Sequence, residues 1–352
     1  MSRDLDVQVK HLAAAVRRSR AAARSQGHAN ARQCTTFRGQ TDLADEILSA
    51  LESGSELPSR RAFRGPSFEP IEPKEAFSST VERTDVLNFD GLPDHITDAL
   101  LNCEEADPDE AHWEGPDGEL LEHVASCGGQ GRVQVVRVLD PFNPVGLFTP
   151  LSEEPLAAVA AVDIATGEPI APYLGDVVTE DDPSIDETTN TYLFELDPDE
   201  LALRGYDGPR GVGLRVDASK RGGLARFVND RASFGLPART ANSYLELLYD
   251  GEQREWVVML FASERIPKGR EIIVDYGPDY WQVALPSILN GHEASSSSSR
   301  PRAGVKNTKP QPKGAKKNSR PSASSPTPRG KASSSGAAAA TSHKKILGKR
   351  GR

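Results

Sequence analysis

Residues 262–277 read ASERIPKGREIIVDYG, a polar turn followed by a short apolar run. Pro267, Lys268 and Gly269 mark the turn, because Pro and Gly supply the backbone angles that turns require. The run from Ile272 to Tyr276 predicts a strand, since β-branched and aromatic residues favour extended backbone. This stretch therefore predicts a turn that leads the chain into its last strand.

The segment just upstream predicts a β-hairpin. Two apolar runs of similar length, 244–249 (YLELLY) and 256–262 (WVVMLFA), flank a polar loop with Asp250 and Gly251. Five more short runs rich in Val, Ile or aromatic residues, separated by turn residues, lie at 133–139, 156–163, 172–178, 191–196 and 212–216. The pattern predicts a mostly β domain with short helices over residues 131–290.

The order of four segments resembles the SET-domain protein lysine methyltransferases. They are AVDIATGEPI (161–170) followed by YLGD (173–176), YLF (192–194), RFVN (226–229), and the 262–277 stretch quoted above. The resemblance covers about residues 133–289. It implies a SET-domain-like β fold with a C-terminal pseudoknot, in which the RFVN segment threads under the end of the domain.

Methyl transfer to an amine sets two requirements. The nitrogen lone pair must lie in line with the methyl carbon at ~3 to 3.5 Å, and the amine must be neutral, although an exposed Lys has a pKa near ~10.4. A narrow channel lined by Tyr would disfavour the ammonium form. By resemblance, the catalytic residues are Tyr276, Tyr173 and Tyr192. The alternative for each of them is packing in the core.

The resemblance also implies S-adenosylmethionine as the cofactor. The residues expected to bind it are Arg226, Phe227, Asn229, Asp230, Tyr276 and Trp281. Phe227 can equally pack in the core, and Trp281 can lie at its edge.

Three departures from the family pattern bear on the cofactor. Asp230 stands where the family usually has His, and a longer loop (231–241) precedes Asn242. Only half of the usual Gly-x-Gly motif is present, at 145–148.

The regions outside 131–290 differ in composition. Residues 1–130 predict an N-terminal extension with linkers and two short helices, at 9–24 and 42–51. Residues 291–352 carry 15 Lys and Arg against one acid, and they have almost no large apolar side chains. We expect this tail to be disordered, and to act as a nuclear-import signal, a weak nucleic-acid contact or a solubilising segment.

Several classes of protein are excluded by composition. The longest uncharged apolar run, 156–162, is far shorter than the ~20 residues that a membrane span needs. The N-terminus has no apolar core of a secretory signal. The three Cys form no CxxC pair and the seven His show no ligand spacing, so no metal site and no disulfide framework are expected.

Charge suggests the substrate. The whole chain has 42 basic and 51 acidic residues, so the 15 and one of the tail leave 27 minus 50, or −23, on residues 1–290. Ten of the 25 residues from 176 to 200 are acidic, beside the expected peptide groove. A lysine-rich protein such as a histone tail would be attracted there, although the segment can also be a plain solvated loop.

We expect an S-adenosylmethionine-dependent lysine methyltransferase in the nucleus, or otherwise in the cytoplasm. The alternative is a SET-like module without turnover that binds chromatin or other basic partners.

Overall fold

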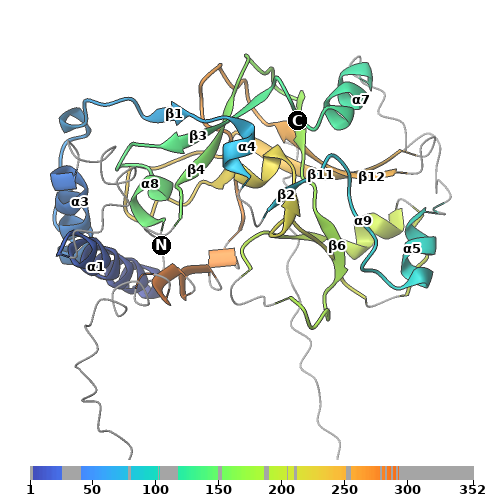
Figure 1. Ribbon diagram of the computed structural model, residues 1–352, viewed down its shortest axis with the longest axis horizontal. Helices are drawn as coiled ribbons and strands as arrows, with labels where there is room; N and C mark the ends of the chain where they lie inside the picture. The colour runs from blue at the N-terminus through green and yellow to red at the C-terminus, as the bar shows by residue number, and fades with distance from the viewer. Residues whose placement is uncertain are drawn as a thin grey trace, which may run out of the picture. The chain divides into compact units, whose positions relative to one another are not determined.

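The computed structural model describes residues 3–25, 41–77, 81–101, 103, 118–149, 153–185, 190–203, 205–209, 212–250, 255–277, 280–281, 284–286, 288–290 and 292. Residues 104–117 of the predicted N-terminal extension and, except for His292, the predicted tail lie outside these residues. Residues 1–299 form one compact unit. Figure 1 shows that unit as small sheets surrounded by short helices, which confirms the predicted fold class.

Strands β3 (Val133–Val138), β4 (Leu156–Ala160) and β1 (Phe68–Pro70) form the first sheet, in the order β1-β3-β4. Both pairings are antiparallel. The sequence analysis predicted β3 and β4 but missed β1, which is only three residues long and contains a Pro. Its pairing with β3 crosses the predicted domain boundary at residue 130.

The predicted hairpin is confirmed as β11 (Ser243–Asp250) and β12 (Glu255–Ala262), which β5 (Pro169–Pro172) extends. A third sheet has the order β6-β8-β7, from Asp176–Thr179, Leu214–Asp217 and Leu193–Leu196. Two parallel pairs complete the set: β2 (Glu82–Arg83) with β9 (Arg221–Gly222), and β10 (Asn229–Asp230) with β13 (Ile273–Val274).

The run predicted as one strand over 172–178 is two strands in two sheets. The chain leaves β5 at Pro172 and enters β6 at Asp176, with Gly175 just before the new strand. A Cβ atom on Gly175 would lie 2.3 Å from the carbonyl oxygen of Asp217. Only Gly permits this close approach of the two backbones, so the chain can change sheets here.

The helices among the described residues are α1 (Arg3–Ser25), α3 (Thr41–Ser53), α4 (Pro73–Ala76), α5 (Asp94–Leu101), α7 (Gly118–Ser126), α8 (Pro144–Phe148) and α9 (Pro198–Leu203), with 3-10 turns at Arg60–Ala62 and Leu224–Phe227. The two predicted N-terminal helices are confirmed as α1 and α3, of which α1 is longer than expected. None of the helices within the described ranges has the length and apolar character to cross a membrane.

Helices α1, α3 and α8 share one apolar cluster, and Figure 1 shows them beside one another. Leu12, Ile47 and Leu147 are fully buried in it. The partial Gly-x-Gly at 145–148 therefore lies in helix α8, which Asn143 caps through its side chain and Pro144 begins. Gly146 fits because an added Cβ would lie 2.8 Å from the Asp140 carbonyl oxygen. This close approach explains why the segment keeps a Gly at position 146.

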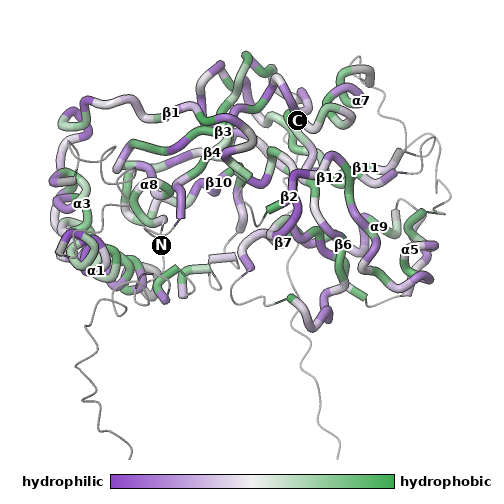
Figure 2. Tube along the Cα trace, viewed as in Figure 1, coloured by the Kyte–Doolittle hydropathy of each residue, from purple (hydrophilic) through white to green (hydrophobic). Residues whose placement is uncertain are grey.

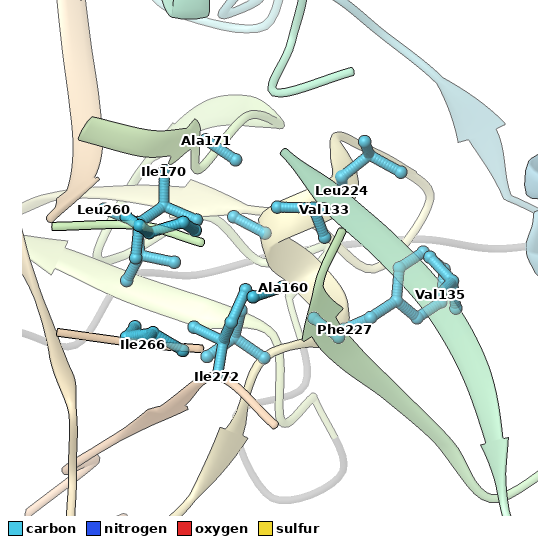
Figure 3. Packing of buried hydrophobic residues seen from close by; sticks show 14 of the residues in the cluster. Val133, Val135, Ala160, Ile170, Ala171, Leu224, Phe227, Leu260, Ile266 and Ile272 are labelled. Carbon is cyan, nitrogen blue, oxygen red and sulfur yellow. The ribbon is translucent and has the colours of Figure 1, made fainter. Parts of the chain in front are cut away.

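The main core lies between the first sheet, the hairpin sheet and the segment around residue 226. Figure 3 shows Val135, Phe227 and Leu260 from these three parts packed among Ile and Ala side chains. Figure 2 shows the corresponding hydrophobic stretches along β3 and β4. Residues before 131 also enter the cores, because the indole N–H of Trp256 donates to the carbonyl of Leu100 in α5 at 2.8 Å.

Candidate active site

Two of the segments that resemble the SET family, RFVN and the 262–277 stretch, meet at the β10–β13 pair. Asn229 pairs with Ile273 and Asp230 with Val274, in parallel. This is the contact that the predicted pseudoknot requires. Buried Asn242 holds β13 in place, since its side chain accepts from the Ile273 N–H at 2.8 Å and donates to the Glu271 carbonyl at 2.9 Å.

Tyr276 follows β13 and closes onto the RFVN segment. Its hydroxyl donates to the carbonyl of Val228, and its backbone N–H donates to the Asp230 carboxylate. Burial, assisted by the neighbouring phenols, raises the pKa of Tyr276 well above its usual range. The phenol is therefore neutral at physiological pH, and its oxygen still has lone pairs that can accept a hydrogen bond.

Tyr173 and Tyr192 lie in the same group of rings. The Tyr173 hydroxyl donates to the carbonyl of Tyr192 at 2.8 Å, and the Arg226 guanidinium carbon lies 4.2 Å from the centre of the Tyr192 ring. Burial raises the pKa of Tyr173, although the nearby Arg226 opposes the rise. The structure thus brings together the three predicted tyrosines. The hydroxyls of Tyr173 and Tyr276 donate to backbone carbonyls, which is also the arrangement expected for tyrosines that pack in the core.

The sequence analysis missed a fourth tyrosine. The ring of Tyr280 lies 4.6 Å from that of Tyr276 and 4.9 Å from that of Trp281. Burial raises its pKa as well, against a hydrogen bond with Thr191 that lowers it. The signal that could have found Tyr280 is its place directly before Trp281, four residues after Tyr276.

The side chains of Arg226 and Phe227 are occupied by the protein. Arg226 Nε donates to the carbonyl of Ala218 at 3.0 Å, in addition to its contact with Tyr192. Phe227 is 6% exposed and packs edge-on against Phe77 at 5.3 Å. The side chains of both predicted binding residues therefore contact other parts of the protein. A molecule bound at this segment would contact their backbone atoms.

Asn229 is oriented by a backbone carbonyl. Its amide Nδ2 donates to the carbonyl of Leu156 at 3.1 Å, at the start of β4. Within the described part of the chain, its carbonyl oxygen Oδ1 has no hydrogen-bond donor. The residue thus presents an acceptor to a bound molecule.

Asp230 is buried and fully engaged. Its carboxylate accepts from the indole N–H of Trp281 at 2.9 Å, from the Ala232 N–H at 2.6 Å and from the Tyr276 N–H. Trp281 is half-buried and packs edge-on against Phe234 at 4.6 Å. Asp230 therefore positions Trp281 and Tyr276, which the sequence analysis did not foresee for the residue at the family's His position.

A pocket lies at β6 and β8, and its lining residue Asp217 pairs with Leu193, the neighbour of Tyr192 in the sequence. It encloses about 240 Å³ and is lined by Asn88, Gly91, Asp176, Val177, Val178, Asp182, Ser184, Ile185, Asp217, Lys220 and Arg221. Asp217 also acts on Tyr173, where its charge contributes to the raised pKa. Part of the predicted acidic segment therefore lines a pocket next to the predicted lysine channel, although Arg221 lies 3.4 Å from Asp176 and offsets its charge.

Across the described ranges, no three His, Cys, Asp or Glu side chains are grouped as a metal site would require. The acidic side chains of the pocket are instead bound within the protein. Asp217, for example, accepts from the Asn190 amide at 3.0 Å.

Comparison with known proteins identifies the central part of the chain. Residues 156–277 match the SET domain. No curated protein matches the chain.

Solved structures resemble between about a third and a half of the chain. The crystal structure of KRYPTONITE with mCHH DNA, an H3(1-15) peptide and SAH is 26% identical over 35% of this chain and 21% of that chain, with a TM-score of 0.25. A humanized mutant of the Chaetomium thermophilum Polycomb Repressive Complex 2 bound to GSK126 is 26% identical over 36% and 14%, with a TM-score of 0.26. The ctPRC2 structure bound to S-adenosylmethionine is 23% identical over 50% and 19%, with a TM-score of 0.30. This chain therefore covers about a fifth or less of each solved chain.

Proposed function

Since residues 156–277 carry a SET domain, we propose that this protein transfers a methyl group from S-adenosylmethionine to a lysine of a basic protein. The observation that carries the proposal is the closure of Tyr276 onto the RFVN segment, through its hydroxyl and the carbonyl of Val228. This contact places a neutral phenol next to the segment expected to hold the cofactor.

The cofactor would be held by few side chains. The Asn229 carbonyl oxygen is an acceptor that fits a donor of the cofactor, and the half-buried ring of Trp281 fits a sulfonium or adenine face. Arg226, Phe227 and Asp230 would act through the backbone that they support. When bound, S-adenosylmethionine supplies an electrophilic methyl group on a positively charged sulfur.

The tyrosines suit the second substrate, the lysine amine. Tyr173, Tyr276 and Tyr280 are half-buried, and the loss of solvation raises their pKa and keeps their phenols protonated and uncharged. An ammonium entering such a site loses solvation, which lowers its pKa and favours the reactive neutral amine. Because the phenols stay protonated, their oxygens would orient the amine by accepting hydrogen bonds from its N–H groups. They would not act as bases that remove its proton.

The substrate would be lysine-rich. Residues 1–290 carry a net charge of −23, from 27 basic and 50 acidic residues, and Asp176, Asp182 and Asp217 line the pocket beside the tyrosines. A negative field of this kind raises the local concentration of a basic peptide and speeds its association. A histone tail has this chemistry, and a nuclear location would follow. Residues 291–352, with 15 Lys and Arg, would add a weak contact with nucleic acid.

One observation supports the alternative, a SET domain that binds chromatin or other basic partners without turnover. Asp230 replaces the family's usual His, and its carboxylate is engaged by Trp281 and Ala232. The Asp230 carboxylate therefore has fewer lone pairs left to accept hydrogen bonds from a cofactor.

A peptide array incubated with the full chain and methyl-labelled S-adenosylmethionine tests the proposal. Each Lys-rich peptide is paired with a copy in which every Lys is Arg, which keeps the charge and removes the acceptor amine. We expect label on Lys peptides and none on the Arg copies. Binding of both sets without label on either would favour the module without turnover.

A further inference from the structure

Glu271 is a buried acid that no step above uses. It lies between the Gly269 turn and β13, and its side chain is 8% exposed. The amide of Asn143 donates to its Oε2 at 2.8 Å, and the Arg239 guanidinium lies 2.6 Å from its Oε1. Asn229 also contacts this carboxylate through its side chain. A buried cluster of charged side chains is therefore in contact with Asn229, which is expected to bind the cofactor.

Arg239 comes from the loop that departs from the family pattern. Its side chain is 11% exposed, and its second terminal nitrogen donates to Asn143 Oδ1 at 3.4 Å. The loop is fixed on the protein by Leu236 and Phe234, which are buried against α3 and α8. The longer 231–241 loop thus delivers a cation to a buried acid that would otherwise lack one.

The charge on Glu271 depends on these neighbours. Burial raises the pKa of Glu271 above its usual value, although the charge of Arg239 and hydrogen bonds from Arg239, Asn143 and Asn229 oppose the rise. Without the cation, a carboxyl group in this position would tend to take up a proton. A protonated carboxyl can donate as well as accept, so it would no longer dictate the orientation of a neighbouring amide.

Both groups next to the Asn229 amide are acceptors when Glu271 is ionised. The Leu156 carbonyl takes one N–H of Nδ2 at 3.1 Å, and the Glu271 carboxylate accepts a hydrogen bond from the same side chain. If the Asn229 amide were flipped by 180°, its oxygen would face the Leu156 carbonyl and the Glu271 carboxylate. This arrangement is unfavourable because all of these groups are acceptors. The carbonyl oxygen of Asn229 is then held on the other side of the amide.

We infer that Arg239 and Glu271 are positioning residues that orient Asn229, so that its carbonyl oxygen accepts a hydrogen bond from the cofactor. This inference rests on the proposed function. It gives the 231–241 loop a role in cofactor affinity, although no residue of that loop would touch the cofactor.

The test uses the full chain and isothermal titration calorimetry with S-adenosylmethionine. Removing Arg239 alone would leave a buried charge unpaired and can prevent folding, so the main variant is the neutral pair Arg239→Met with Glu271→Gln. Both changes are close in volume, and Gln can rotate to donate or accept. The control, Arg265→Met, removes a cation from an exposed ion pair with Asp163.

We expect the neutral pair to melt near the wild-type temperature and to bind the cofactor at least ~10-fold more weakly, as the loss of one hydrogen bond to a charged group implies. Arg265→Met should keep wild-type affinity. Wild-type affinity in the neutral pair would overturn this inference and leave the proposed function standing. Absence of binding by the wild-type chain would overturn both.

Discussion

The indole N–H of Trp281 donates to the Asp230 carboxylate at 2.9 Å, across 51 residues of sequence. The same carboxylate accepts from the backbone of Tyr276, so one buried acid joins the RFVN segment to the aromatic end of the domain. The SET family usually has His at this position. A carboxylate can accept from several donors at once, which a His cannot.

Replacing Asp230 should therefore loosen both ends of the site. Asp230→Ala leaves the Trp281 and Tyr276 donors without an acceptor, and we expect a loss of about 3 kcal/mol or more in the free energy of unfolding. Urea unfolding followed by Trp fluorescence measures it. Asp163→Ala is the matched control, because Asp163 accepts from the Lys268 backbone N–H at 2.8 Å in an exposed position. Equal losses in the two variants would show that Asp230 does not anchor the site.

Gly235 tests whether the 231–241 loop packs on α3. Its φ is +81°, and an added Cβ would lie 2.9 Å from a methyl of Leu51. Gly269 has the same φ of +81° with nothing within 4 Å of the added atom. Gly269→Ala should cost about 1 to 2 kcal/mol of unfolding free energy from backbone strain alone. Gly235→Ala should cost more, since Leu51 must also move, and an equal or smaller loss in urea unfolding would refute the packing.

His292 makes stability sensitive to acid. Its Nε2 bonds to the carbonyl of Phe148 at 2.8 Å, while buried Nδ1 has no partner in the described part of the chain. Burial lowers the pKa of His292, so the folded protein keeps it neutral while the unfolded chain takes up a proton below the usual value of 6.5. Stability is thus present above that pH and lost as pH falls.

The melting temperature should consequently fall between pH 7.5 and pH 5.5 by about 2 °C more in the wild type than in His292→Gln, which can still donate to Phe148. His123→Gln changes an exposed residue of α7 and serves as the control. An identical fall in wild type and His292→Gln would contradict this account of His292.

The sequence predicted the elements whose signal is local. The hairpin β11–β12 was found because Asp250 and Gly251 separate two apolar runs, and β3 and β4 because each is a short apolar run bounded by turn residues. The final strand β13 was predicted from the run 272–276, but its pairing with β10 was only implied by resemblance. Strand β1 and the pair β2–β9 were missed, because two or three residues carry no periodicity.

The site was predicted as a set of residues, without their contacts. Tyr173, Tyr192 and Tyr276 come together as expected, yet nothing in the sequence indicates that Asp230 would bond Trp281, or that Arg239 would reach Glu271. Such contacts depend on how the 231–241 loop folds back. That path is set by tertiary packing of Phe234, whose φ of +48° is unusual for a non-Gly residue and gives no signal in the sequence.

The central claim is methyl transfer at Tyr276, and single-turnover transfer to a Lys peptide labelled in the array tests it most directly. The variant Tyr276→Phe removes the hydroxyl that donates to Val228 and keeps the ring. We predict that its rate falls at least ~10-fold, as expected for losing one positioned polar group, while calorimetric binding of S-adenosylmethionine persists. Transfer by Tyr276→Phe at the wild-type rate would contradict the account.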